Sequence, residues 1–229
     1  MERFQFPPWV DRLVAGAIPV IGLGALYAAG LLAYAMSPRT TNVGYSPKQP
    51  IPYNHALHVG ELKIDCRYCH NTVDQAAYAA VPPVSVCSNC HSAANSDGTV
   101  PTAAVHTNSR RLLPLREAQA TGKPVLWEKI HDLADFVYFD HSAHVNRGVG
   151  CVSCHGRVDK MEQVYQAESL SMTWCLECHR RPEPHLRPID RVTDMEWKPP
   201  EGKTAEQVGA GLRADLKINP STNCSTCHR

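Results

Sequence analysis

One cysteine-histidine motif, present five times, carries the chemistry available to this sequence. Each copy has two cysteines three positions apart and a histidine directly after the second one. The cysteine pairs are Cys66 and Cys69, Cys87 and Cys90, Cys151 and Cys154, Cys175 and Cys178, and Cys224 and Cys227; the histidines are His70, His91, His155, His179 and His228. Two thiols one helical turn apart can bond to both vinyl groups of a haem, and the next imidazole then reaches the iron. The sequence therefore predicts five covalently bound haems c.

Two other uses of paired cysteines fit less well. Such pairs also bind zinc, and a single pair can be a thioredoxin-type redox centre, but neither use requires a histidine after every pair. The five motifs contain all ten cysteines of the chain. None is left for a disulfide, a nucleophilic thiolate or an iron–sulfur cluster, so we interpret the chain as a pentahaem cytochrome.

Composition agrees with a fold built around cofactors. The chain has 23 basic and 22 acidic residues, a balance that excludes the strongly basic surface typical of nucleic-acid binding. It contains 18 prolines in 229 residues, and only 7% of its residues are aromatic. Long regular elements and an ordinary aromatic core are therefore not expected. We predict a mainly α and irregular multihaem cytochrome c, with haems as apolar mass and one N-terminal transmembrane helix.

The N-terminal segment, residues 1–36, has the features of a membrane anchor. Leu13 to Met36 is an uncharged run of 24 residues, longer than the roughly 20 needed to cross the hydrocarbon as a helix. The alternative is a cleaved secretory signal, because Ala33-Tyr34-Ala35 resembles a processing site. The apolar run exceeds the usual signal length of about 7–15 residues, which favours an uncleaved anchor.

Orientation follows from haem chemistry, because positive charges flank the apolar run almost equally. Haem attachment takes place outside the cytoplasm. We therefore expect a single-pass protein of the bacterial cytoplasmic (inner) membrane, with the haem domain on the periplasmic side. Residues 37–52, rich in Ser, Thr, Pro and Gly, form a predicted tether, and residues 53–229 form the extracytoplasmic pentahaem domain.

An internal repeat organises that domain. Tyr53-Asn54-His55-Ala56-Leu57-His58-Val59 matches Phe139-Asp140-His141-Ser142-Ala143-His144-Val145, and two haem motifs follow each copy. Val73-Asp74 then matches Val158-Asp159. This duplication predicts two dihaem modules, residues 53–93 and 137–184, with the fifth haem at residues 224–228.

Seven histidines remain outside the motifs as candidate distal ligands. His55, His58, His141 and His144 belong to the repeated His-x-x-His pattern, in which residues three apart share a helix face and can bind two neighbouring haems. As the fifth distal ligand His131 is preferred, since Asp132 could orient its ring, while Met161 and Met172 remain competitors. His106 and His185 are interpreted as surface residues.

Outside the modules the sequence predicts little regular structure. Residues 95–130 form a polar, proline-containing stretch with one helical candidate near residues 115–121. Thr204-Ala205-Glu206-Gln207 fits a capping box and predicts a helix, although Gly209 and Gly211 weaken it. The aspartates near the motifs (Asp65, Asp74, Asp140 and Asp159) are interpreted as turn, capping or propionate-neighbour residues.

The whole pattern resembles the pentahaem membrane-anchored cytochrome c subunit of bacterial alternative complex III. The resemblance rests on the blocks YNHALHVGELKIDCRYCH, PPVSVCSNCHSA, FVYFDHSAHVNRGVGCVSCHGRVDKM, LSMTWCLECHRRPE and TNCSTCHR. It implies a helix packed among polytopic quinol-binding subunits, an iron–sulfur subunit beside the cytochrome, and electrons leaving towards a monohaem cytochrome c or a terminal oxidase.

Three function classes remain. In the first, the chain is a non-catalytic electron-transfer subunit of a quinol-oxidising complex; this is the favoured interpretation. In the second, it resembles single-helix quinol dehydrogenases, which usually have a methionine where this chain has Thr72. In the third, it is a multihaem reductase, which would need an open iron although the histidines suffice to close all five.

Overall fold

The computed structural model describes residues 5–92 and 105–228 of the chain. Contacts divide the chain into two compact units, Met1–Asn42 and Val43–Arg229. Several sequence predictions extend beyond the described residues: residues 1–4 of the anchor segment, residue 93 at the end of the first module, residues 95–104 of the polar stretch, and residue 229.

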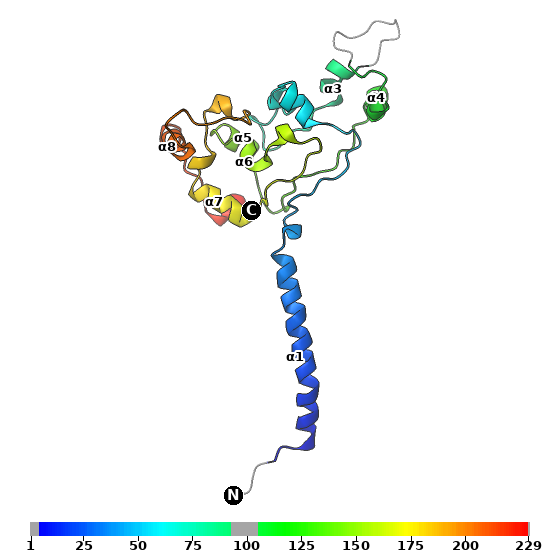
Figure 1. Ribbon diagram of the computed structural model, residues 1–229, viewed down its shortest axis with the longest axis vertical. Coiled ribbons are helices and arrows are strands. Elements are labelled where there is room, and N and C mark those ends of the chain that lie inside the picture. Colours follow the sequence, from blue (N-terminus) through cyan, green and yellow to red (C-terminus); the bar gives the residue numbers. More distant parts are fainter. Residues whose placement is uncertain (1–4, 93–104, 229) are drawn as a thin grey trace. The chain divides into compact units, whose positions relative to one another are not determined.

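The first unit consists mainly of one long helix, α1 (Pro8–Ala35) (Figure 1). It begins five residues before the predicted apolar run, because Pro8 suits the first turn, where its missing N–H has no intrahelical partner. After the helix, the hydroxyls of Ser37 and Thr40 donate to the carbonyls of Tyr34 and Ala35, at 2.7 and 3.0 Å. In the described part of the chain α1 is the one helix long and apolar enough to cross a membrane, so it is compatible with a single-pass anchor.

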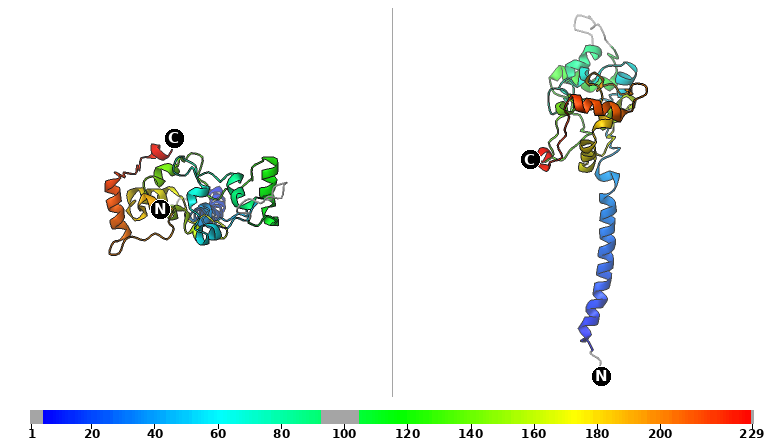
Figure 2. Two further views of the ribbon diagram at one scale, coloured as in Figure 1. Left: turned by 90° about the horizontal axis from the view of Figure 1, so that it is seen from above. Right: turned by 90° about the vertical axis from the view of Figure 1, so that its left-hand side faces the viewer.

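The second unit contains short helices joined by long irregular segments (Figures 1 and 2). After the 3-10 turn η1 (Pro38–Thr40) in the first unit, the elements are η2 (Ala56–Glu61, a π-helix), α2 (Cys66–Cys69), α3 (Val84–His91), η3 (Arg110–Leu112), α4 (Leu113–Thr121), α5 (His141–Val145), α6 (Val152–His155), η4 (Val158–Lys160), α7 (Met172–Arg180), η5 (Glu183–His185), η6 (Ile189–Arg191), α8 (Ala205–Asp215) and α9 (Cys224–Cys227). One antiparallel bridge, Val149 to Leu186, is the sole β pairing within the described residues. The mostly helical and irregular architecture is as predicted.

The apolar core made by the protein itself is small. Val73, Val145 and Val192 form one buried cluster, with Ala79 packed against it. Leu115 and Leu186 are also fully buried, at separate places along the chain. A core of this size contributes little of the burial that normally stabilises a domain, which agrees with cofactors supplying apolar mass.

The helices predicted outside the haem motifs are present. Helix α4 covers the candidate at residues 115–121 and ends at Gly122, whose φ of 68° lies in the left-handed region that glycine favours. Helix α8 begins with the complete Thr204–Gln207 capping box, so that prediction is confirmed. Gly209 lies where α8 packs on η5, because a Cβ there would overlap the carbonyl group of Glu183.

The predicted tether ends earlier than expected. The amide of Gly44 donates to the carbonyl of Gln166 at 2.8 Å, and the hydroxyl of Ser46 donates to that of Val164 at 3.0 Å. Ile51 is buried. Residues 43–52 are therefore packed into the second unit, and only residues 37–42 group with the first unit.

Candidate haem sites

Each described cysteine pair lies on a short helix or its first turn, as haem attachment requires. At the first, third and fifth motifs the histidine closes this turn: the amides of His70, His155 and His228 donate to the first cysteine's carbonyl at 2.8, 3.0 and 2.9 Å. At the second and fourth motifs the histidine is itself part of helix α3 or α7. Asp65 and Asn223 cap the helices α2 and α9, which confirms the capping role for Asp65. None of the ten cysteines, all among the described residues, forms a disulfide.

Four motif histidines have the ring orientation of a metal ligand. In each, Nδ1 lies within hydrogen-bonding distance of a backbone carbonyl oxygen: His70 with Ala80 (2.8 Å), His91 with Val105 (2.9 Å), His179 with Ser221 (2.6 Å) and His228 with Phe136 (3.2 Å). A carbonyl can only accept, so Nδ1 carries the hydrogen. The lone pair is then on Nε2, the tautomer that second-shell contacts select in metal-bound histidines.

The histidines of the repeat are held in the same way. Nδ1 of His58 donates to the carbonyl of Asn54 at 2.8 Å, and Nδ1 of His144 donates to that of Asp140 at 2.7 Å. Both contacts reach back four residues along the chain. His141 instead donates from Nδ1 to Ala77 of the other module, at 2.8 Å. These three imidazoles therefore also keep Nε2 available.

One aromatic ring supports each pair of repeat histidines. Tyr53 lies edge-on to His55 and stacks on His58, with ring centroids 4.7 and 4.4 Å apart. Phe139 repeats this arrangement with His141 and His144, at 4.8 and 4.6 Å. The sequence match between the two segments is thus accompanied by matching side-chain geometry.

Motif and repeat histidines face each other at the separation that a shared iron requires. Two imidazoles bound at about 2 Å on opposite sides of one metal have centroids roughly 6 Å apart. The observed pairs are His58 with His91 at 6.2 Å, His141 with His155 at 6.4 Å, and His144 with His179 at 6.1 Å. The residues at the second, third and fourth motifs therefore fit a haem with two axial imidazoles.

Burial keeps several of these imidazoles neutral, the form that binds a metal. Burial, followed by the charges of His70 and His58, lowers the pKa of His55 to about 4. Its Nδ1 is buried and has no hydrogen-bond partner. Burial, followed by neighbouring histidines beginning with His131, lowers the pKa of His155 to about 3.

His131 lies beside the third motif. Its ring is 4.5 Å from that of His155 and nearly perpendicular to it, at 78°. This separation is too short for two ligands on opposite sides of one iron. Its Nε2 is nevertheless buried without a partner, and burial lowers the pKa of its ring. The assignment of His131 as the fifth distal ligand stays a prediction.

Three other candidate axial ligands, Met161, Met172 and His106, differ in their exposure to solvent. Met161 is 4% exposed and packs in the interior, whereas Met172 begins α7 and is 66% exposed. His106, interpreted from the sequence as a surface residue, is exposed but stacks near His91 at 6.4 Å and 18°. From the sequence, His106 is interpreted as a surface residue. The one signal that could have pointed to it is that more histidines lie outside the haem motifs than the repeat accounts for.

Comparison with known proteins agrees with this geometry. Residues 137–229 match the family of cytochrome c7 and related cytochrome c. The chain is also 28% identical over 163 residues to the protein called "Menaquinone reductase, multiheme cytochrome c subunit" of Nitratidesulfovibrio vulgaris, an alignment covering 62% of this chain and 72% of that protein. Together they support a multihaem cytochrome c. Its role is electron transfer through covalently bound haem.

The five motifs contact one another in a row. The side-chain amide of Asn89 donates to the hydroxyl of Tyr68 at 2.9 Å, which joins the second motif to the first. The side chains of Cys66 and Cys151 lie beside each other, which joins the first motif to the third. His141 and His144 on α5 face the third and fourth motifs, and the contact of His179 with Ser221 brings the segment before the fifth motif to the fourth.

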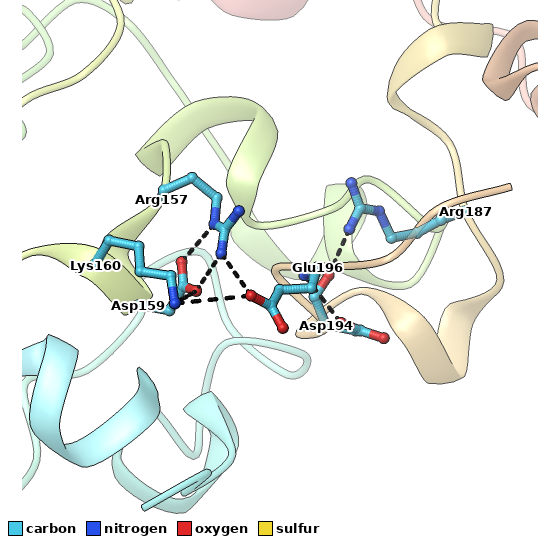
Figure 3. Close-up of polar contacts among 6 residues, drawn as sticks. All are labelled: Arg157, Asp159, Lys160, Arg187, Asp194 and Glu196. Atoms are coloured by element: carbon cyan, nitrogen blue, oxygen red, sulfur yellow. Dashed lines mark hydrogen bonds and ion pairs between the residues drawn. The ribbon is translucent and has the colours of Figure 1, made fainter. Parts of the chain in front are cut away.

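A charged cluster lies at η4, the 3-10 turn that follows the third motif in the sequence (Figure 3). Arg157 donates to both carboxylate oxygens of the buried Asp159, at 2.7 and 2.6 Å, and also to Glu196 at 3.0 Å. The hydrogen bond and charge of Arg157 lower the pKa of Asp159. This contact fixes η4, whose next residue, Met161, accepts from the amide of Ala56 in the first module at 3.0 Å.

Proposed function

We propose that this chain is the pentahaem electron-transfer subunit of a membrane quinol-oxidising complex of the alternative complex III type. The observation that carries the proposal is the set of opposed imidazoles about 6 Å apart. Irons with two protein ligands are closed to substrates and suited to exchanging electrons. An open coordination position, which a multihaem reductase needs, is therefore disfavoured at the second, third and fourth motifs. The remaining histidines suffice in number to close the other two irons.

In this proposal the protein's task is to hold and tune the haems. The ten motif cysteines form the thioether bonds, and the five motif histidines are the proximal ligands. His55, His58, His141 and His144 are distal ligands, and His131 is the fifth. Haem supplies the one-electron chemistry, while axial ligation, burial and hydrogen bonds set its potential.

The contacts between motifs support one continuous series. Their spatial order runs from the second motif through the first, third and fourth to the fifth. Because the two modules meet at Cys66 and Cys151, the module junction lies inside the series. The second and fifth motifs are then its ends, where electrons would enter from and leave to other proteins.

The anchor and the surroundings of the first motif favour a subunit over a self-sufficient quinol dehydrogenase. Helix α1 supplies one wall of a quinol pocket at most, and residues 37–52 contain no histidine or acidic residue to take quinol protons. The hydroxyl of Thr72 donates to the carbonyl of Tyr78 and accepts from the amide of Ala80, both at 3.0 Å. Thr72 thus braces the loop that orients His70.

The expected partners are an iron–sulfur subunit, polytopic quinol-binding subunits and a monohaem cytochrome c, with the haem domain outside the cytoplasm. A second candidate is a subunit of a menaquinone-reducing complex, favoured by the similarity to the Nitratidesulfovibrio vulgaris protein. The two candidates differ in the direction of electron flow, which the potentials of the haems and quinone decide.

One preparation tests these alternatives. The chain is purified in mild detergent both alone and with its co-purifying subunits, and its denatured mass should exceed the polypeptide mass by five haems. A quinol analogue should reduce the haems rapidly only in the assembled complex. Rapid inhibitor-sensitive reduction of the isolated chain would instead establish a self-sufficient quinol dehydrogenase. Pre-reduced haems that a menaquinone analogue oxidises quickly in the complex, with no reaction in reverse, would favour the second candidate.

A further inference from the structure

Arg187 is a charged side chain enclosed beside the third haem motif. It is 7% exposed. Its guanidinium lies 5.2 Å from the ring centroid of Trp197, in a cation–π contact. On its other side is Gly150, where a Cβ would overlap the guanidinium, so a larger residue there would displace the arginine. The charge is thus held between an aromatic ring and the backbone residue that precedes Cys151.

Among the described protein residues, the hydrogen bonds of Arg187 reach no carboxylate oxygen. One terminal nitrogen donates to the backbone carbonyl of Asp194 at 2.8 Å, while Nε is buried with no partner. The carboxylate of Asp194 is engaged elsewhere, accepting from the amide of Glu196 and lying 3.6 Å from Arg191. Within the described ranges 5–92 and 105–228, Arg187 forms no ion pair with a carboxylate.

The nearby Arg157 differs from Arg187 because carboxylates neutralise its charge (Figure 3). It is 43% exposed and pairs with two carboxylates. Arg187 is largely removed from solvent and pairs with no carboxylate among the described protein residues. Burial of an unpaired charge is costly, and burial lowers the pKa of Arg187. The pKa of an arginine is so high that the side chain keeps its charge at neutral pH.

The charge acts on the junction of the two modules. The guanidinium of Arg187 lies against Gly150, which directly precedes Cys151, the first attachment cysteine of the third motif. Cys66 of the first motif lies beside Cys151. Electrostatic interactions in a poorly solvated interior are several times stronger than at the surface and are weakly screened by salt.

We propose that Arg187 raises the reduction potential of the haem attached through Cys151. The inference deepens the proposed function and rests on haem attachment at that motif. Reduction adds one electron to the iron and lowers the charge of the site by one, so a fixed positive charge nearby stabilises the reduced form. Arg187 itself exchanges no proton or electron; it acts as a permanent charge, one of the means by which proteins tune haem.

The test is a spectroelectrochemical titration of the full-length pentahaem chain. Arg187→Gln keeps a donor for the carbonyl of Asp194 but removes the charge, and it should move one of the five one-electron components to lower potential. Arg187→Lys keeps the charge and should restore most of the shift. Lys198→Gln removes the same formal charge from an exposed neighbour of Trp197 and should leave all components in place. The shift should persist at about 1 M salt because the charge is buried.

Assignment to the third motif uses His141→Met, because thioether ligation raises a haem potential. The component that rises in this variant should be the one that falls in Arg187→Gln. If Arg187→Gln does not incorporate five haems, Gly150→Ala supplies the test, since its Cβ displaces the guanidinium and should lower the same component.

Two results would overturn the proposal. One is a five-haem Arg187→Gln variant with unchanged potentials. The other is an equal fall in Arg187→Gln and Arg187→Lys, which would assign the effect to packing. Both measurements use the isolated chain and are independent of quinol reactivity, so they separate this inference from the choice of complex. A mass lacking the third haem would count against the proposed function instead.

Discussion

The two His-x-x-His segments present nearly the same imidazole geometry from different backbones. Residues 53–58 lead into a π-helical turn, η2, whereas residues 139–144 lead into an α-helix, α5. In both, an aromatic ring is edge-on to the first histidine and stacked on the second. The side-chain arrangement is thus common to the copies while the helix type is not, as expected if ligand geometry is what the fold must preserve.

The first histidine of each segment shows the main difference. Nδ1 of His141 donates to Ala77 in the other module, whereas Nδ1 of His55 is buried without a partner. The second segment is therefore tied to the first module through a ligand ring, whereas the first segment reaches the second module through its backbone, from the amide of Ala56 to the carbonyl of Met161. The asymmetry lies in the support of the first histidine's ring.

The largest effect is expected from removing a second histidine of either segment. His58→Ala and His144→Ala should each leave one iron without a distal imidazole, producing one high-spin haem that binds carbon monoxide. His185→Ala is the control, since His185 has no ring contact with a motif histidine among the described residues. Visible and electron paramagnetic resonance spectra measure the outcome. A low-spin spectrum in both variants would remove these two residues from the ligand set.

Because His106 also stacks near His91, the two segments need not respond alike. If His144→Ala becomes high-spin but His58→Ala does not, His106 is the ligand that replaces His58. The fifth ligand is tested in the same way with His131→Ala and Met172→Ala. We expect the high-spin haem in the first variant, and its appearance in the second would correct the assignment.

Motif chemistry and local capping could be predicted from the sequence because both depend on residues close together in the chain. The Thr204–Gln207 box and the cap by Asp65 are of this kind. The π-helical turn η2 could not be predicted, because the capping contacts of the two segments are alike. The side chain of Asn54 accepts from the amide of Leu57, just as that of Asp140 accepts from the amide of Ala143. The isolation of Arg187 was also beyond prediction, because it results from Gly150 and Trp197, which lie 37 and 10 residues away in the sequence.

An intermediate effect is expected where the repeated Val-Asp pairs differ. Asp159 is buried and bound by Arg157, whereas its counterpart Asp74 forms no ion pair within the described residues. Asp159→Asn should destabilise the domain by about 1–3 kcal/mol, because it weakens a charge-assisted bond in a buried place. Asp74→Asn is the matched control and should change stability little. Chemical denaturation of the five-haem protein measures both.

The pH dependence of this contact has a defined sign. The hydrogen bond from Arg157 lowers the pKa of Asp159 in the folded protein. Its stabilisation is therefore fully present above the ordinary aspartate pKa of about 4 and is lost as the pH falls through the lower folded value. Asp159→Asn should remove this contribution to acid denaturation. An unchanged acid transition would contradict the assigned role.

The smallest effect is expected from exchanging the two supporting rings. The hydroxyl of Tyr53 hydrogen-bonds the sulfur of Cys69, and burial holds the pKa of Tyr53 above its ordinary value, so the group stays protonated and donates. Phe139 has no hydroxyl. Tyr53→Phe therefore makes the first segment equivalent to the second, and thermal stability should fall by less than about 1 kcal/mol, because sulfur is a weak acceptor.

The ring itself should matter more than its hydroxyl. Tyr53→Phe retains the stacking on His58 and should leave all haems low-spin, whereas Tyr53→Leu removes the ring and should loosen the ligand, giving a partly high-spin spectrum. Phe139→Leu should do the same at His144. Spectra and thermal unfolding of the three variants separate the two contributions. A Tyr53→Phe variant as strongly perturbed as Tyr53→Leu would show that the first segment is held by its hydroxyl, and the equivalence of the two segments would then fail at this position.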